Sequence, residues 1–134
     1  TGHLVFSTLH TKDAKGTITR VVDMFPADRI KEITSQLALS LSYVLAQKLV
    51  SRRAGGRRIA MEVFRNTTGV ANLIRTGTWH QIYTQIETGS KDGMITLEHH
   101  LHSLVLSGEI TPEEARLNAN DPQVIDRLLQ PQPA

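Results

Sequence analysis

The sequence contains no cysteine, and this absence removes several kinds of chemistry. Without thiols, the chain has no disulfide framework, no cysteine nucleophile and no thiolate zinc site. Aromatic residues are also scarce: three Phe, two Tyr and one Trp leave few rings for stacking nucleic acid bases. No apolar run is longer than a few residues, so the sequence predicts neither a membrane-spanning helix nor a secretory leader.

What is present indicates one globular domain. The chain has 134 residues, of which 40% are hydrophobic, and chains of roughly this length bury enough surface to fold without disulfides. The net charge of +2 argues only weakly for a polyanionic partner. The chain begins at Thr1, inside an apolar pattern, and we therefore expect it to be a fragment of a longer protein.

The pattern of the first half of the sequence indicates an α/β arrangement. Residues 4–9 are apolar and rich in β-formers, which predicts a buried strand. We then expect a helix capped by Asp13, a helix from Pro26 carrying the apolar stripe of residues 30–45, and a hairpin of residues 49–50 and 59–64 around two glycines. Because a lone strand needs neighbours, further strands are expected upstream of Thr1.

The second half is predicted to be helical. Apolar stripes recur over residues 70–74, 79–86 and 97–105, and cap signals stand at Thr96, Thr111 and Asp121. We expect three parts: a core portion over residues 1–65, a helical subdomain over 66–129 and a disordered tail over 130–134.

A candidate anion site lies where the first strand is expected to end. Ligands of open α/β sheets bind beyond the carboxyl ends of strands, and helix N-termini attract anions. The side chains of Thr8, His10 and Thr11 occur at this point, where they could bond a terminal phosphate. Alternatively, His10 only satisfies the turn. His3 lies an odd seven residues earlier, so the two imidazoles are not expected to share a metal.

Two other clusters attract attention. His99, His100 and His102 are interpreted as a solvated helix face, because the spacing supplies no third metal ligand. Six basic residues fall within 18 positions around the hairpin: Lys48, Arg52, Arg53, Arg57, Arg58 and Arg65. They are open to three interpretations: a grip on a nucleic acid backbone, a solvated tip, or a contact between subunits. The chain has no phosphate loop and no nucleophile elbow.

Residues 1–11, Thr-Gly-His-Leu-Val-Phe-Ser-Thr-Leu-His-Thr, resemble the histidine box of the secretion ATPases. These are the hexameric motors of type IV pili and of type II and type IV secretion. The resemblance continues through residues 17–26, 47–49 and 55–57 and Glu62. Residues 51–58 stand where assembly and type II members carry four cysteines, and residues 93–97 and 108–115 are similar to the C-terminal helices of retraction ATPases.

The resemblance implies the C-terminal portion of a RecA-like P-loop NTPase domain, with the phosphate loop preceding Thr1. The full-length protein is then expected to be a hexameric motor for pilus retraction that uses ATP and Mg²⁺, whereas the fragment alone is expected to be inactive and to bind neither. His10 takes the role of phosphate sensor, His3 supports it, and Thr8 and Thr11 lie near the nucleotide. The implied location is cytoplasmic, at the inner face of the cytoplasmic membrane, with pilus-base or inner-membrane platform proteins as partners.

The resemblance also assigns contacts with other subunits or with the pilus machinery to Arg57, Arg58, Asn72, Leu73, Ile74 and Arg75. Residues 69–76 depart from the Ala-Ile-Arg-Asn-Leu-Ile-Arg-Glu motif of retraction ATPases, because only the central Asn-Leu-Ile-Arg is retained. This departure leaves room for a paralogue. The rival hypotheses are a helical domain that binds nucleic acid through the basic hairpin, which we do not expect, and a non-catalytic assembly module.

Overall fold

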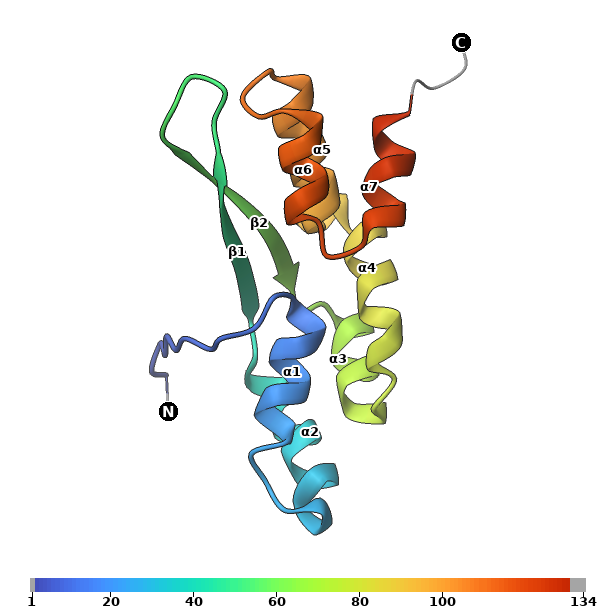
Figure 1. The fold of residues 1–134 in the computed structure, drawn as a ribbon. Coiled ribbons are helices and arrows are strands. Elements are labelled where there is room, and N and C mark those ends of the chain that lie inside the picture. Colours follow the sequence, from blue (N-terminus) through green and yellow to red (C-terminus); the bar gives the residue numbers. More distant parts are fainter. Residues whose placement is uncertain (1, 131–134) are drawn as a thin grey trace.

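The structure, a computed structural model, describes residues 2–130. In chain order its elements are α1 (Ala14–Val22), α2 (Ile30–Ser40), β1 (Tyr43–Ser51), β2 (Arg57–Arg65), α3 (Thr68–Thr76), α4 (Ile82–Thr88), α5 (Leu97–Leu106), α6 (Pro112–Asn118) and α7 (Pro122–Leu129). Short 3₁₀ turns, Ala27–Arg29, Trp79–Gln81 and Ser90–Asp92, precede α2, α4 and α5. The prediction of an α/β chain with a hairpin and a helical C-terminal half is confirmed (Figure 1).

The hairpin is longer than the sequence predicted. β1 and β2 pair antiparallel from Tyr43 opposite Arg65 to Ser51 opposite Arg57, and the turn uses the positive φ angles of Gly55 and Gly56. Val44, which was expected in the second helix, belongs to β1, and so does Leu45. The helix α2 therefore ends before these residues. From Tyr43 onward burial alternates with a period of two, as it does along a strand.

Asn66 fixes the point at which α2 ends. Its side-chain amide donates to the carbonyl oxygens of Ala38, at 2.9 Å, and Leu41, at 2.8 Å. These bonds satisfy carbonyl groups that have no partner inside a helix, and they hold the chain as it turns into β1. The helix-to-strand change is therefore determined by a residue 25 positions beyond Leu41.

Two apolar clusters pack against the hairpin. The first joins α1–α4 to the end of the hairpin where the strands enter and leave, and comprises Ala14, Ile18, Ala38, Val44, Phe64, Val70, Ile74, Ile82, Ile86 and Met94. The second joins α5–α7 to the half nearer the tip, and comprises Val50, Ala60, Leu97, Leu101, Leu104, Ile110, Ala115 and Ile125. The first cluster crosses the expected boundary at residue 65, which stays a prediction.

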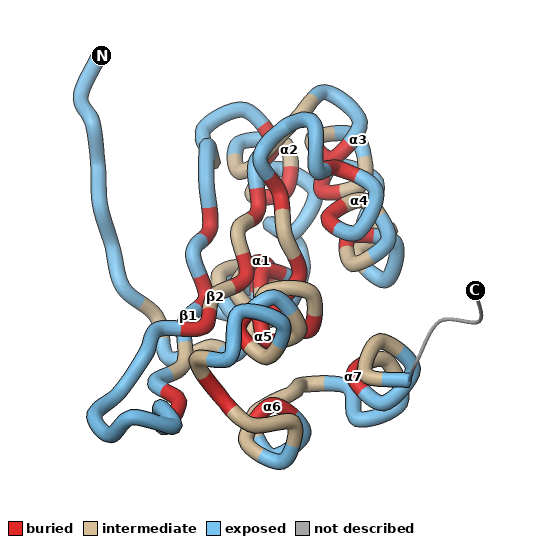
Figure 2. The backbone as a smooth tube through the Cα atoms, turned by 90° about the horizontal axis from the view of Figure 1, so that it is seen from above, coloured by how far each residue is buried: buried red, intermediate tan, exposed pale blue. Residues whose placement is uncertain are grey.

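The predicted strand over residues 4–9 does not form. This segment has no regular structure and extends away from the body of the molecule (Figure 2), with Leu4 82%, Val5 79% and Phe6 88% exposed. Within residues 2–130, the only sheet is the two-stranded hairpin, whose strands pair with each other. The apolar pattern is that of a strand, but its hydrogen-bonding neighbours are missing from this part of the chain.

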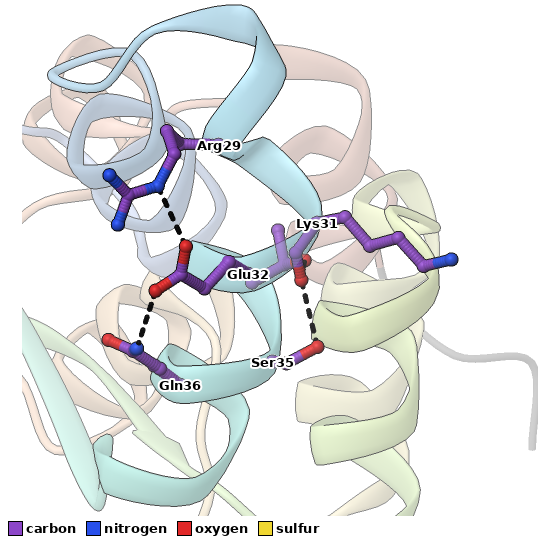
Figure 3. Close-up of polar contacts among 6 residues, drawn as sticks. Arg29, Lys31, Glu32, Ser35 and Gln36 are labelled. Atoms are coloured by element: carbon purple, nitrogen blue, oxygen red, sulfur yellow. Dashed lines mark hydrogen bonds and ion pairs between the residues drawn. The ribbon is translucent and has the colours of Figure 1, made fainter.

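The outer surface of α2 is polar over its first turns (Figure 3). The Glu32 carboxylate accepts from Arg29 Nε at 2.7 Å and from Gln36 Nε2 at 3.2 Å, and Ser35 Oγ donates to the Lys31 carbonyl at 2.8 Å. Exposed pairs of this kind contribute little to stability. This face of α2 is therefore a solvated surface.

The predicted caps of the later helices are confirmed. Thr96 Oγ1 accepts from the amide of His99, and Thr111 Oγ1 accepts from that of Glu114, at 3.1 Å. Asp121 caps α7 by accepting from two amides of its first turn. Of the predicted tail, residues 131–134 lie outside the described residues.

Candidate functional site

The histidine-box residues lie in an extended segment immediately before α1. His3, Thr8 and His10 are exposed, and Thr11 is half-buried. The chain enters the folded body only at residues 12–14, where α1 begins. His10 thus stands four residues before the first residue of α1, with its imidazole accessible to a ligand or another chain.

The N-terminus of α1 is already bonded to carboxylates. Asp13 Oδ1 accepts from the amide of Gly16 at 2.6 Å, and Glu62 Oε1 accepts from the amide of Ala14 at 2.8 Å. These are two of the donors that would otherwise attract an anion to the helix. A phosphate that approaches this point must therefore be bound by side chains and not by these amides.

Thr11 is tied to α1 through a chain of hydroxyl groups. Thr17 Oγ1 donates its only proton to the carbonyl oxygen of Asp13, at 3.0 Å. The 2.6 Å contact between the two threonine hydroxyls consequently has Thr11 as its donor. In this arrangement the Thr11 hydroxyl anchors the segment, and of the candidate donors at its end the side chains of Thr8 and His10 are the exposed ones.

Two lysines add positive charge beside these donors. Lys12, immediately before the N-cap of α1, and Lys15, on its first turn, are exposed, and a groove of about 380 Å³ runs along this face of the helix from Thr11 to Asp23. Imidazole, hydroxyl and ammonium groups all donate to phosphate oxygens, so this set of side chains fits an anionic ligand. Asp13 and Asp23 also line the groove, which gives it mixed charge.

A cavity of about 190 Å³, lined by both charged and apolar side chains, lies at the start of α1. Its walls come from α1, β2, α4, α5 and the turn between α6 and α7, and its residues are Lys12, Asp13, Lys15, Glu62, Ile82, Tyr83, Ile86, Glu98, Asn120 and Asp121. The cavity thus lies between Lys12 and Asp13, which follow the histidine box, and the C-terminal helices.

Glu62 and Glu98 place two buried carboxyl groups at this cavity, 2% and 1% exposed. Burial raises the pKa of Glu62 to about 7, with smaller contributions from Asp13 and Glu98, while the backbone amides of Ala14 and Leu97 oppose the rise. Glu98 Oε2 accepts from the Tyr83 hydroxyl at 3.3 Å. Burial and the charge of Glu98 also raise the pKa of Tyr83.

Sequence reasoning did not identify this pair as part of a site. Glu62 was used only as a point of resemblance, although alternation along β2 places it on the same inward face as Ala60 and Phe64. That alternation was the available indication of a buried acid. Glu98 occupies the first turn of α5, where an acidic residue is common, so no local pattern indicates that it is buried.

Three basic residues of the hairpin contact the turn between α5 and α6. Glu109 lies 3.2 Å from Arg58 Nε and 3.9 Å from Arg52 Nε, and Arg53 Nε donates to the carbonyl oxygen of Ile110. Arg57, at the start of β2, is exposed. Part of the positive charge is therefore compensated within the chain.

The other predicted contact residues divide by exposure. On α3, Asn72 and Arg75 face solvent, whereas Ile74 is fully buried in the first cluster and Leu73 packs against it.

Of the three clustered histidines, His99 contacts Thr96 and His100 contacts the backbone of Met61. No group of three potential metal ligands occurs within residues 2–130.

Comparisons with known proteins identify the family. Residues 1–116 match the family described as Type II/IV secretion system protein. The chain is 46% identical over 92% of its length to the type IV pilus retraction ATPase PilT of Pseudomonas aeruginosa, and 43% identical over 90% to a twitching motility protein of Neisseria gonorrhoeae. It spans about a third of these relatives, 36% and 33% of their lengths.

A solved structure agrees with these matches. The crystal structure of the pilus retraction motor PilT with bound ADP superposes with a TM-score of 0.86, at 35% identity, over 95% of this chain and 35% of that one. None of the helices in residues 2–130 has the length and apolar character needed to cross a bilayer. On the family match and the PilT likeness together, this chain belongs to the type II/IV secretion system protein family, as a PilT-type secretion ATPase sequence.

Proposed function

We propose that this chain is the C-terminal portion of a motor ATPase that retracts type IV pili. The observation that carries the proposal is the 46% identity to PilT over 92% of the chain, and the family match over residues 1–116 supports it. The full-length protein hydrolyses ATP to ADP and phosphate in a hexameric ring and converts the energy into movement of its subunits.

His10 is the phosphate sensor in this proposal. Its imidazole is exposed next to α1, where the amides of Ala14 and Gly16 are already bonded to Glu62 and Asp13. Together with the Thr8 hydroxyl, it is the donor available to a terminal phosphate, and His3 supports the same segment. A sensor must bind the two nucleotide states differently, and a side-chain contact that is lost when the phosphate leaves meets this requirement.

ATP with Mg²⁺ supplies the phosphoryl group and the charge neutralisation that phosphoryl transfer needs. Within residues 2–130, this chain presents donors that fit phosphate oxygens and no cluster that fits the cation. We therefore assign no magnesium ligand here. This chain contributes the sensing contact and the helices that respond to it.

The assembly and its partners follow from the same resemblance. Arg57 and Arg58 lie at the exposed turn of the hairpin, where they contact a neighbouring subunit, while Asn72 and Arg75 present the exposed face of α3 to the pilus base or its inner-membrane platform. The motor works at the cytoplasmic face of that membrane. No nucleic acid partner is proposed, since Glu109 already binds two of the hairpin arginines.

The proposal is tested with the full-length protein and with cells that lack it. We expect the purified protein to release phosphate from ATP, and we expect deletion cells to keep surface pili but lose twitching. Absence of hydrolysis would overturn the proposal. Hydrolysis without a retraction defect would instead support a paralogous motor, which the departure at Ala71 and Thr76 from the retraction motif favours as the second candidate.

A further inference from the structure

The histidine segment is held to the body of the molecule at a few identifiable points. Residues 2–10 extend outward, and residues 11–14 connect His10 to the helices and strands of the described chain. Thr11 and Asp13 bond only within α1 and its own N-terminal turn. The contacts that reach other elements are those of Lys12 and Ala14.

Asn120, in the turn between α6 and α7, reaches the first of these residues. Its side-chain Nδ2 donates to the carbonyl oxygen of Lys12 at 3.1 Å, across 108 positions of sequence. The same side chain accepts from Lys48 Nζ through Oδ1 at 2.9 Å. Both ends of the amide are thus engaged, which fixes its orientation.

The turn that carries Asn120 is itself hydrogen-bonded to α5 and β1. Glu98 Oε1 accepts from the backbone amides of Asn120, at 2.9 Å, and Asp121, at 3.0 Å. Lys48 Nζ also donates to the carbonyl oxygen of Asn118 at 2.7 Å. Bonds from α5 and β1 therefore fix the backbone from which the Asn120 side chain reaches the histidine segment.

Glu62 holds the second point. Its buried carboxyl group accepts from the amide of Ala14, the first residue of α1, and projects from β2 in the middle of the hairpin. A buried amide that lost this partner would be left unsatisfied, which is costly. Lys12, which follows the histidine segment, is consequently bonded to the α6–α7 turn by Asn120, and Ala14 is bonded to the hairpin by Glu62.

We propose that Asn120 and Glu62 are positioning residues, which fix Lys12 and Ala14 and thereby set the location of His10 relative to the C-terminal helices. The inference rests on the sensor role of His10 in the proposed function. It means that a displacement of α6 and α7 is transmitted to the sensor through the Asn120–Lys12 bond, and that the reverse transmission uses the same bond.

The test compares Asn120→Ala with Asn118→Ala in the full-length protein. Asn118 lies at the same corner, but its side chain bonds only to Glu114 within α6. Loss of one hydrogen bond predicts that the amides of residues 12–14 exchange hydrogen about two- to tenfold faster in Asn120→Ala. We expect the same variant to show a lower kcat at unchanged nucleotide affinity, and Asn118→Ala to match the wild type in both measurements.

Glu62 is tested with a conservative pair. Glu62→Gln retains an oxygen that can accept from Ala14, whereas Glu62→Met does not, so exchange at Ala14 should stay near wild type in the first and rise in the second. Melting curves show whether Glu62→Met still folds; if it does not, the Asn120 comparison alone decides.

The outcomes distinguish a failure of the positioning role from a failure of the proposed function. Equal exchange and equal kcat in Asn120→Ala and Asn118→Ala would overturn the inference. If the wild-type protein hydrolyses no ATP, the proposed function fails, and hydrogen exchange at residues 12–14 still decides whether Asn120 fixes the segment. A faster exchange without any change in kcat would also overturn the positioning role.

Discussion

At the scale of single residues, Glu62 is the most unusual group in the molecule. It lies on the inward face of β2 between the fully buried Ala60 and Phe64, and its carboxyl group accepts from the amide of Ala14 at 2.8 Å. A carboxyl group in this position is more stable protonated than ionised at moderately acidic pH. The stability of the fold should therefore depend on pH through this residue.

The first prediction concerns the sign of that dependence. The pKa of Glu62 is about 7 in the folded chain, against a usual value of 4.5, so between these values the folded state holds a proton that the unfolded state releases. Its stabilising contribution is complete below pH 4.5 and is lost as the pH rises through 7, a change of about 3 kcal/mol in the free energy of unfolding.

Denaturant titrations of the wild type and of Glu62→Gln measure this change. The variant cannot titrate at this position, and it should gain stability relative to the wild type as the pH is raised from 5 to 8. Parallel stability profiles for the two proteins across this range would show that Glu62 titrates as an ordinary surface acid.

The sequence predicted the roles of single residues correctly where their hydrogen-bond partners are close in sequence. The caps Asp13, Thr96 and Thr111 could be recognised because each bonds an amide three positions away. Glu98 and Asn120 could not, since their partners are 22 and 108 positions distant and only the fold brings them together.

At the scale of elements, the hairpin organises both apolar clusters. Phe64 at one end packs with α1–α4, whereas Val50 and Ala60, nearer the tip, pack with α5–α7. Each set of helices has its own contact with the same two strands. The hairpin therefore joins the helices of the first cluster to those of the second.

Removing the ring of Phe64 should weaken the first cluster severely. Phe64 is fully buried, and replacing a core phenylalanine by alanine typically costs about 3–5 kcal/mol of stability. Phe6→Ala is the matched control, because that ring is 88% exposed. Chemical denaturation of the two variants should show a large loss for Phe64→Ala and almost none for Phe6→Ala; similar losses would contradict the described packing.

The tip of the hairpin should affect assembly more than folding. Exposed ion pairs such as Arg58–Glu109 contribute about 0–1 kcal/mol, so Arg57→Glu with Arg58→Glu should leave the monomer folded. In the full-length protein, the double variant should form fewer rings, as measured by light scattering. Rings of unchanged size and activity would leave the tip as a solvated surface.

Elements were predictable from sequence to the extent that they stabilise themselves. Helices α3 and α5–α7 carry apolar stripes with their own caps, and the glycine pair determined the hairpin turn. The strand over residues 4–9 was not borne out, because a strand forms only where neighbours accept its hydrogen bonds. The β1 boundary was misplaced because apolar residues at 41, 44 and 45 also fit helical spacing.

At the scale of the whole molecule, the exposed segment is the main departure from a self-contained fold. Leu4, Val5 and Phe6 are each more than three-quarters exposed, and the segment projects away from both clusters. Contiguous apolar side chains in this state favour association with another surface. In the proposed full-length motor, that surface is the remainder of the ATPase core.

The isolated chain should consequently self-associate. Substituting Leu4→Ser and Phe6→Ser should shift it toward the monomer in concentration-dependent light scattering, because the apolar segment is then replaced by hydroxyl groups. Leu117→Ser is the control, since Leu117 is 80% exposed but lies on α6, far along the chain from the segment. An equal shift in the control, or a monodisperse wild type at high concentration, would contradict this prediction.

The central claim is that His10 senses the phosphate while the bulk of nucleotide binding lies elsewhere. The most direct measurement is the ATPase rate of full-length His10→Ala, taken together with its ADP and ATP affinities. The account predicts a rate at least tenfold lower than wild type, about 1.4 kcal/mol in the barrier, with nucleotide affinities changed by less than a factor of about two. A wild-type rate in His10→Ala would contradict it.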